Sequence, residues 1–278
     1  AHTRPASSVA IKFDDQTITY DDLCREIDLT TAYILDDGTL KRGDRIAYFG
    51  MNNPEIFVIL MAAARLGIIL VPLNWRLSVE ELAYQLADCT PSWLLYDDAF
   101  KDHINLITND GTLCRSIPID KSNSRHGSPL RNLRKDSILN SPVFCGSVDD
   151  PVLLVYTSGT TGRPKGVVHS HSSLLAGGWT TARAHVLSEH DCGYCVLPIC
   201  HINGLCVSVM GCLISGGQLL LAPKFSNSRF WGDIEAGAVT WFSVVPTIIS
   251  HVLHSTQDPS DAARAKLRFG RSASSALA

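Results

Sequence analysis

The first hundred residues alternate short apolar runs with longer amphipathic ones, and this rhythm constrains the fold of the 278-residue chain most strongly. Residues 45–50 and 93–96 have the length and composition of buried strands, whereas residues 22–35 and 80–87 show helical periodicity. Strands that alternate with helices favour parallel pairing, with helices covering the faces of the sheet. We therefore expect a layered α/β fold with a largely parallel sheet.

Several local signals indicate where elements begin. Residues 9–13 and 17–20 flank a polar turn, as in a short hairpin. Pro54 suits the first turn of a helix that follows two asparagines. Ser78 and Glu81 form a capping-box pattern ahead of the helix at residues 80–87.

The most apolar segment, residues 56–73, reads IFVILMAAARLGIILVPL. Arg65 and Gly67 interrupt it and Pro72 closes it, so the uninterrupted apolar part is too short to cross a bilayer. A buried helix to about Leu66, followed by a buried strand at residues 68–73, explains the segment without a membrane span.

The middle of the chain breaks the rhythm. Residues 101–148 are polar and rich in Ser and Asn, which predicts a variable connection with one strand inside. The rhythm returns at Val152, so we expect one α/β subdomain over residues 1–148 and a second over 149–278. Further elements expected in the second are strands at 166–169, 193–197, 218–222 and 240–245, and helices starting near Ser172 and spanning 204–214.

Composition narrows the partners and the compartment. A formal net charge of -3 offers no global field for nucleic acid or an anionic membrane. Nine cysteines without a leader pattern predict a reducing, cytoplasmic location, and a peroxisomal one stays open because the natural C-terminus is not seen. Cys192 and Cys195 form a Cys-x-x-Cys, but on an extended strand they point to opposite faces, which disfavours a metal or redox site. Homo-oligomerisation stays open.

A loop of unusual composition carries the chemistry: residues 153–166 read LLVYTSGTTGRPKG. Its glycines let backbone N–H groups approach phosphate oxygens, and its hydroxyl groups add donors or reach a magnesium ion. Lys165 and Arg163 place positive charge against a polyphosphate. The order of residues differs from a Walker A loop, because Lys165 follows a proline and precedes a glycine.

This loop resembles, position for position, the signature loop of the adenylate-forming superfamily, which includes acyl-CoA synthetases, aryl-CoA ligases, firefly luciferases and peptide-synthetase adenylation domains. The resemblance runs along essentially the whole chain. It includes the segments TYDDL at 19–23, KRGDR at 41–45, PICHING at 198–204, VVPT at 244–247 and RFGRSASSAL at 268–277. It implies the layered α/β/α large N-terminal domain of these enzymes, without the small C-terminal lid.

The resemblance also implies a reaction. A carboxylate attacks the α-phosphate of MgATP to give an acyl-adenylate and pyrophosphate, and a thiol, usually coenzyme A, then displaces AMP. Catalytic roles fall to Lys165 and His201, and Thr161 contacts the magnesium region. The residues implied to hold the phosphates are Thr157, Ser158, Gly159, Thr160, Thr161, Gly162 and Lys165.

Further positions are implied for the adenine and the acid. Ser274, Ser275 and Ala276 match the small residues that line adenine, although many relatives have Gly or Pro there. His201 borders the acyl pocket, whose walls are expected at Trp241, Val245, Pro246 and Thr247. The segment HINGLCVSVMGCLISGG at 201–217 resembles fatty- and aryl-acid ligases more than amino-acid activators. This resemblance implies a medium-chain, long-chain or aromatic acid, and small dicarboxylates such as oxalate stay open.

Other functional positions of the family do not occur in this chain. Its members continue past the position of Ala278 into a magnesium-binding Glu, a ribose-binding Asp and a lid with a catalytic Lys. Two hypotheses follow: the activating half of an acyl- or aryl-CoA ligase, inactive in isolation, or a truncated non-catalytic module on the same fold.

Overall fold

The computed structural model describes residues 7–108, 114–119, 146–157, 163–255 and 257–273. The chain divides into two compact units, one formed by residues 22–173 and the other by residues 1–21 together with 174–278. Each is built on its own six-stranded sheet. The subdomain boundary expected between residues 148 and 149 stays a prediction.

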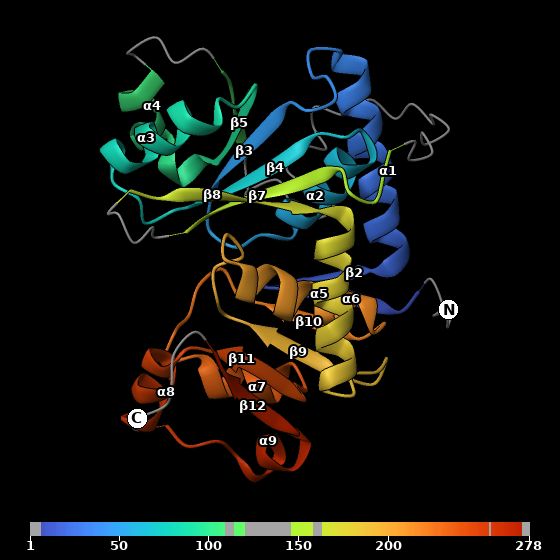
Figure 1. Cartoon of the computed structure of the whole chain (residues 1–278). Coiled ribbons are helices and arrows are strands. Elements are labelled where there is room, and N and C mark those ends of the chain that lie inside the picture. Colours follow the sequence, from blue (N-terminus) through green and yellow to red (C-terminus); the bar gives the residue numbers. More distant parts are fainter. Residues whose placement is uncertain (1–6, 109–113, 120–145, 158–162, 256, 274–278) are drawn as a thin grey trace. The chain divides into compact units, whose positions relative to one another are not determined.

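The sheet of unit 22–173 is parallel except at one edge (Figure 1). Its strand order is β6-β5-β3-β4-β7-β8, and β7 and β8 form an antiparallel pair. This confirms the largely parallel sheet expected from the alternating rhythm. The strands are β3 (Arg45–Gly50), β4 (Ile69–Asn74), β5 (Trp93–Asp97), β6 (Arg115–Ile119), β7 (Pro151–Thr157) and β8 (Lys165–Ser170).

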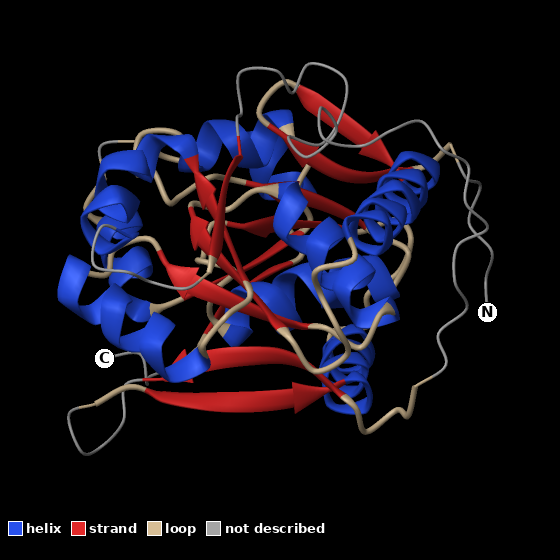
Figure 2. Ribbon diagram, turned by 90° about the horizontal axis from the view of Figure 1, so that it is seen from above, coloured by secondary structure: helices blue, strands red, loops and turns tan. Residues whose placement is uncertain are grey.

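Helices lie beside these strands (Figure 2), and their boundaries follow the expected signals. Pro54 occupies the first turn of α2 (Pro54–Arg65), with Asn53 as its N-cap. Ser78 and Glu81 form the predicted capping box of α3 (Val79–Cys89), so two backbone N–H groups at its start are satisfied by side chains. α1 (Tyr20–Asp37) extends two residues past the expected end.

One helix of this unit was not predicted. Residues 101–148 contain the single expected strand, β6, but also α4 (Lys101–Thr108), which follows the short 3₁₀ helix η1 (Asp98–Phe100). Ile104 and Ile107 of α4 are almost fully buried in the core. The prediction of a connection without a helix was therefore wrong at its start, because two apolar residues three apart suffice to anchor one short helix.

The second sheet joins distant parts of the sequence. Its strand order is β12-β11-β9-β10-β1-β2, with an antiparallel hairpin β1–β2 at one edge and parallel pairing elsewhere. The hairpin confirms the turn predicted after Phe13. The strands are β1 (Val9–Phe13), β2 (Gln16–Thr19), β9 (Cys192–Cys195), β10 (Gln218–Leu221), β11 (Trp241–Val244) and β12 (Phe269–Ser272).

The helical segments of this unit include one unusual element. The apolar helix expected at 204–214 is a π-helix, η4 (Asn203–Met210), continued by the short α6 (Gly211–Ile214). Pro246 lies in the first turn of α8 (Pro246–Leu253). The remaining helices are α5 (His171–Ala184), α7 (Phe230–Ala236) and α9 (Asp261–Lys266).

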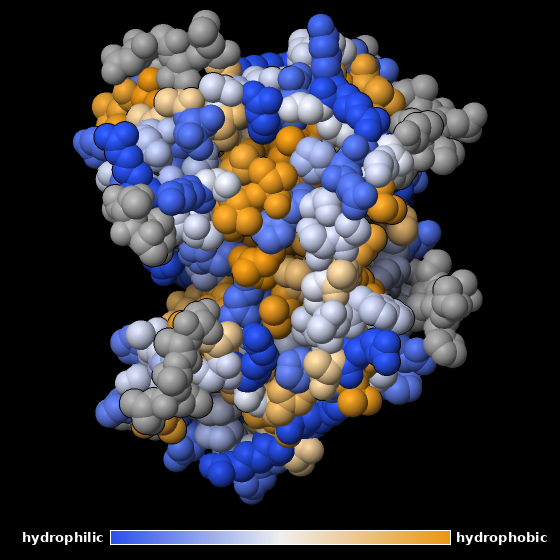
Figure 3. All heavy atoms as spheres, viewed as in Figure 1, coloured by the Kyte–Doolittle hydropathy of each residue, from blue (hydrophilic) through white to orange (hydrophobic). Residues whose placement is uncertain are grey.

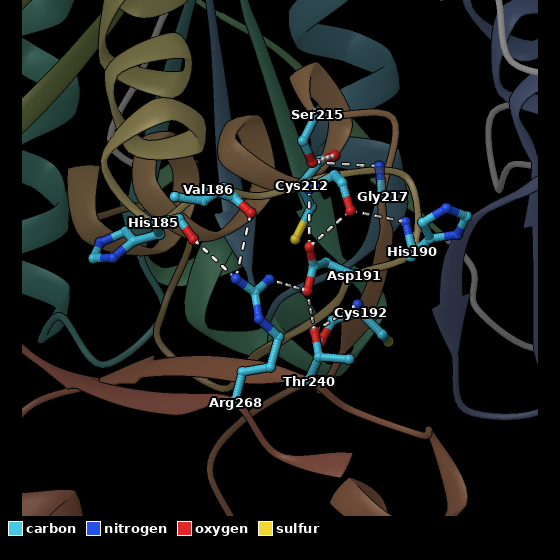
Figure 4. A network of polar contacts seen from close by, with 11 residues as sticks. His185, Val186, His190, Asp191, Cys192, Cys212, Ser215, Gly217, Thr240 and Arg268 are labelled. Carbon is cyan, nitrogen blue, oxygen red and sulfur yellow. Dashed lines mark hydrogen bonds and ion pairs between the residues drawn. The ribbon is translucent and has the colours of Figure 1, made fainter.

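A polar network ties together the starts of three strands in this sheet (Figure 4). Asp191 precedes β9, Thr240 precedes β11 and Arg268 precedes β12. The Asp191 carboxylate accepts hydrogen bonds from Thr240 Oγ1 at 2.8 Å and from Arg268 Nη1 at 2.5 Å. Arg268 also donates to the carbonyl oxygens of His185 and Val186. Side chains around the Asp191 carboxylate thus link the amino-terminal ends of β9, β11 and β12.

Within the described residues, no helix is long and apolar enough to span a bilayer. The apolar segment at 56–73 forms most of α2 and β4, as predicted. On the face seen in Figure 3, hydrophilic residues cover most of the surface and smaller groups of hydrophobic residues lie between them.

Candidate active site

The hydroxyl-rich loop is carried by the hairpin of β7 and β8. Thr157, the last residue of β7, lies directly opposite Lys165, the first residue of β8, and both are exposed. Thr157 Oγ1 donates to the Lys165 carbonyl oxygen at 3.4 Å. The strands therefore bring the two ends of the loop together and leave the Lys165 ammonium on the surface. Ser158, Gly159, Thr160, Thr161 and Gly162 lie outside the described residues.

The helix α3 supports this hairpin. Tyr156 Oη donates to Asp88 Oδ2 at 2.6 Å and also contacts the Gln85 carbonyl oxygen. Burial and the Asp88 carboxylate raise the pKa of Tyr156, so the hydroxyl keeps its proton and remains a donor. At the other end of the loop, the Arg163 guanidinium lies 5.8 Å from the centre of the Tyr84 ring. The strand before the loop and the residue after it are thus both held by one helix.

His201 lies on a tight turn that follows β9 in the other unit. The His201 N–H donates to the Pro198 carbonyl oxygen at 3.1 Å, and the His201 carbonyl oxygen accepts from Leu205 N. The side chain of His201 is exposed. A Cβ atom at Gly204 would lie 2.5 Å from the Pro198 carbonyl oxygen, so only glycine fits where the turn closes. The Pro-x-x-His-x-x-Gly pattern therefore reflects a backbone that holds the histidine in place.

The residues expected to wall the acyl pocket differ in burial. Trp241 is 1% exposed and stacks on Phe269, with ring centres 5.7 Å apart, which accounts for it as a core residue. Val245 and Pro246 are half-buried, whereas Thr247 is exposed in the first turn of α8. Their contacts with a substrate stay predictions.

The chain after β12 leads toward the expected adenine residues. Ala273 N donates to the Val244 carbonyl oxygen at 2.9 Å, which continues the pairing of β12 with β11. Ser274, Ser275 and Ala276 follow directly and lie outside the described residues. Ala273, the last described residue of this segment, lies just past the carboxyl end of β12, the side of a parallel sheet where α/β proteins bind ligands.

Sequence reasoning missed one polar cluster near the same sheet edge. Arg271 Nη1 donates to Asn203 Oδ1 and to Ser243 Oγ, each at 3.0 Å. Ser243 Oγ in turn donates to Asn203 Oδ1 at 3.1 Å. The available signal in the sequence was an arginine two residues after Phe269, a spacing that places both side chains on one face of an extended strand.

The Cys-x-x-Cys residues lie in the interior of the second sheet. Cys192 and Cys195 are buried in β9, and burial raises the pKa of Cys192 to about 11 and that of Cys195 to about 12. The thiols therefore stay protonated near neutral pH. Within the described ranges, no group of three His, Cys, Asp or Glu side chains could hold a metal ion.

An antiparallel hairpin at the edge of a largely parallel sheet carries the sequence of the signature loop, which fits an α/β protein of the adenylate-forming type. The family of AMP-binding enzymes matches residues 1–278, and the chain belongs to this family.

Similar proteins include CoA ligases with different substrates in their names. The chain is 33% identical to the sulfoacetate–CoA ligase of Cupriavidus necator over 259 residues, which cover 88% of this chain and 49% of that protein. It is 32% identical to the indoleacetate–CoA ligase of Aromatoleum aromaticum over 247 residues, which cover 85% of this chain and 46% of the relative.

A solved structure confirms the fold. ATP-bound MatB from Rhodopseudomonas palustris superposes with a TM-score of 0.82 at 26% identity, covering 95% of this chain and 51% of MatB. The fold is therefore that of the N-terminal domain of adenylate-forming enzymes. The chain spans about half the length of the curated relatives that it matches.

Proposed function

We propose that the protein containing this chain is an AMP-forming acid–thiol ligase. A carboxylate oxygen of the acid attacks the α-phosphorus of ATP, the bond to the β-phosphate oxygen breaks, and an acyl-adenylate and pyrophosphate form. The sulfur of coenzyme A then attacks the acyl carbon, and AMP leaves. The observation that carries the proposal is the β7–β8 hairpin, which presents Lys165 opposite Thr157 at the ends of the hydroxyl-rich loop.

The hairpin supplies what phosphate chemistry needs. Negative charge grows on pyrophosphate as it leaves, and a fixed cation and fixed donors stabilise that charge more than water does. Lys165 would supply such a cation, from a strand whose partner β7 is anchored to α3 through Tyr156. The glycines and hydroxyls at 157–162 would surround the β- and γ-phosphates. Hydroxyl and phosphate oxygens are ligands that Mg²⁺ accepts, so Thr161 would contact that ion, which neutralises phosphate charge when bound.

The acid and the adenine would be held by residues that follow β9 in the sequence. His201 would border the acyl group and shape the approach of carboxylate and thiol, from a turn fixed by Pro198 and Gly204. Ser274, Ser275 and Ala276 would line the adenine, where larger side chains would collide with the ring. A cytoplasmic location, homo-oligomerisation and the walls of the acyl pocket remain predictions.

The test is ATP–pyrophosphate exchange with the longest natural form of the protein, over a panel of carboxylic acids. We expect exchange that requires an acid and is lost when the acid is omitted. Formation of the CoA thioester and AMP, followed by mass spectrometry, tests the second half-reaction separately. Absence of acid-dependent exchange with every acid would overturn the ligase and favour the non-catalytic module.

A further inference from the structure

Arg271 uses only part of its hydrogen-bonding capacity. A guanidinium group has five N–H donors in a planar fork. Nη1 makes both hydrogen bonds, to Asn203 and Ser243, whereas Nε and Nη2 make none with the part of the chain that the structure describes. The edge formed by Nε and Nη2 has the spacing that binds a carboxylate through two parallel hydrogen bonds.

The fold fixes the direction of this side chain. Arg271 pairs with Ser243 across β12 and β11, just as Phe269 pairs with Trp241 two residues earlier, so all four share one face of the sheet. Asn203 starts the π-helix η4, an element that frequently occurs at functional sites. Ser243 is fully buried and locks Asn203 Oδ1 beside the guanidinium. Arg271 is thus oriented by two neutral groups.

The charge of Arg271 has no counterion within the described ranges. Arg268, three residues earlier, is neutralised by Asp191 at the amino-terminal edge of the same sheet. Arg271 is half-buried, and among the described residues its guanidinium donates to neutral oxygens alone. The pKa of His185 is lowered by burial and, further, by the positive charge of Arg271, which shows that this charge is felt nearby. A partly buried charge without a partner is costly, and an anionic ligand would remove that cost.

We propose that Arg271, oriented by Asn203 and Ser243, binds a second anionic group of the acid substrate. This inference rests on the proposed ligase function and names its substrate class: an acid that carries a carboxylate or similar anion besides the carboxylate that reacts. The reacting carboxylate is a poor partner for Arg271, because the guanidinium would hold the same oxygens that must attack the α-phosphorus of ATP. The phosphates have their own donors at the hairpin, so the second anion is the partner that remains.

This substrate class differs from the medium-chain, long-chain or aromatic acid implied by the family resemblance of the apolar segment at 201–217. That preference took account of the apolar residues but not of Arg271, whose neighbours Ser243 and Asn203 become visible only once β11, β12 and η4 are placed. The cluster of Arg271, Asn203 and Ser243 does not specify the hydrocarbon part of the acid.

The test compares acids in matched pairs: propionate with malonate, butyrate with succinate, and benzoate with isophthalate. For the natural enzyme, kcat/KM in ATP–pyrophosphate exchange should favour at least one diacid over its matched monoacid by about 100-fold or more, because a bound monoacid leaves the half-buried charge of Arg271 unpaired. Arg271→Gln should lower kcat/KM for that diacid by about 100-fold and change the value for its matched monoacid by less than about 5-fold.

Two further variants keep the test decisive. Asn203→Asp places a carboxylate beside Arg271 and should abolish the diacid preference even if Arg271→Gln fails to fold. Arg264→Gln is the control, because Arg264 is exposed on α9 and, among the described residues, its side chain donates to the Pro259 carbonyl oxygen alone. It should leave the ratio of diacid to monoacid unchanged.

Failure of this inference and failure of the ligase function give different results. A preference for monoacids, or an equal loss for both acids of a pair in Arg271→Gln, would overturn the inference and leave the ligase intact. Should no acid support exchange, calorimetric binding of the same diacids without ATP still tests Arg271. Binding that is lost in Arg271→Gln but kept in Arg264→Gln supports the site, and no binding to the natural protein overturns it.

Discussion

The Arg268 guanidinium donates to the Asp191 carboxylate at 2.5 Å, which joins the segment before β12 to the segment before β9, on either side of β11. Asp191 is 5% exposed in its side chain and also accepts from Ser188 N and from Thr240 Oγ1. One carboxylate therefore links three separate segments of the chain at the starts of their strands.

Replacing Arg268 should destabilise the fold. In Arg268→Gln the Asp191 charge stays buried and loses its cation, so we expect the free energy of unfolding to fall by about 1–3 kcal/mol, with the partly exposed Arg268 limiting the loss. Urea unfolding at pH 7 measures it. Arg25→Gln is the control, since the Arg25–Asp22 pair is exposed on both sides and should contribute less than about 1 kcal/mol. Equal losses of unfolding free energy in Arg268→Gln and Arg25→Gln would contradict a stabilising role for the Arg268–Asp191 pair.

The same carboxylate should make stability depend on pH. Burial raises the pKa of Asp191, but hydrogen bonds from Arg268, Thr240 and Ser188 outweigh it, and the folded-state pKa lies below the ordinary 3.8. A lowered folded-state pKa contributes stability above the unfolded-state value, and that contribution is lost as pH falls through the folded-state value. The difference in unfolding free energy between the natural protein and Asp191→Asn should therefore shrink from pH 6 to pH 3. A constant difference would count against this account.

Gly204→Ala should disturb the histidine turn. The added Cβ would meet the Pro198 carbonyl oxygen, a backbone atom that cannot rotate away. We expect a loss of about 1–3 kcal/mol in unfolding free energy, as for overpacked sites. Gly232→Ala is the matched control in α7, where an added Cβ meets nothing within 4 Å and alanine should stabilise the helix by up to about 1 kcal/mol. The prediction fails if both variants are tolerated alike.

Lys165→Met should impair phosphate chemistry without unfolding the protein. Lys165 is exposed, so the unfolding free energy should change by less than about 0.5 kcal/mol. Loss of a fixed cation near the leaving pyrophosphate should lower the exchange rate by about 100-fold. Lys41→Met, at another exposed position, should leave exchange unchanged. A variant with normal exchange would remove Lys165 from the proposed mechanism.

The cysteines should differ sharply in reactivity. Cys24 is exposed, whereas Cys192 and Cys195 are buried with raised pKa values. In the folded protein at pH 8, iodoacetamide should modify Cys24 much faster than either β9 thiol, as followed peptide by peptide in a mass spectrometer. Modification of Cys192 and Cys195 at the rate of Cys24 would reopen a redox role for the pair.

The sequence predicted those features that depend on residues close together in the chain. Pro54 and the Ser78–Glu81 pair marked the starts of helices, because a cap acts within one turn. The loop before Lys165 predicted the family, since its unusual order of glycines and hydroxyls is read directly from neighbouring residues.

Features that depend on strand order could not be predicted. Ser243 and Arg271 meet because β11 and β12 are neighbours in one register, and nothing local to either strand specifies its neighbour. The π-helical geometry of Asn203–Met210 could not be predicted either, because an apolar run favours a helix without specifying whether its hydrogen bonds are α-helical or π-helical. For Trp241, the family resemblance predicts a place in the acyl pocket, whereas the structure shows a buried side chain packed on Phe269.

The pairing of Ile11 with Leu219 has a consequence for synthesis of the chain. Residues 22–173 are continuous in sequence and can fold once they leave the ribosome, since domains generally fold as units from the N-terminus. Strand β1 has no parallel neighbour until β10 has been made. Until then one edge of β1 leaves backbone N–H and C=O groups unpaired, and its apolar residues Ala10 and Ile11 are not yet covered. An unpaired edge invites association with other chains. The nascent protein should therefore depend on chaperones during the interval between the making of β1 and the making of β10.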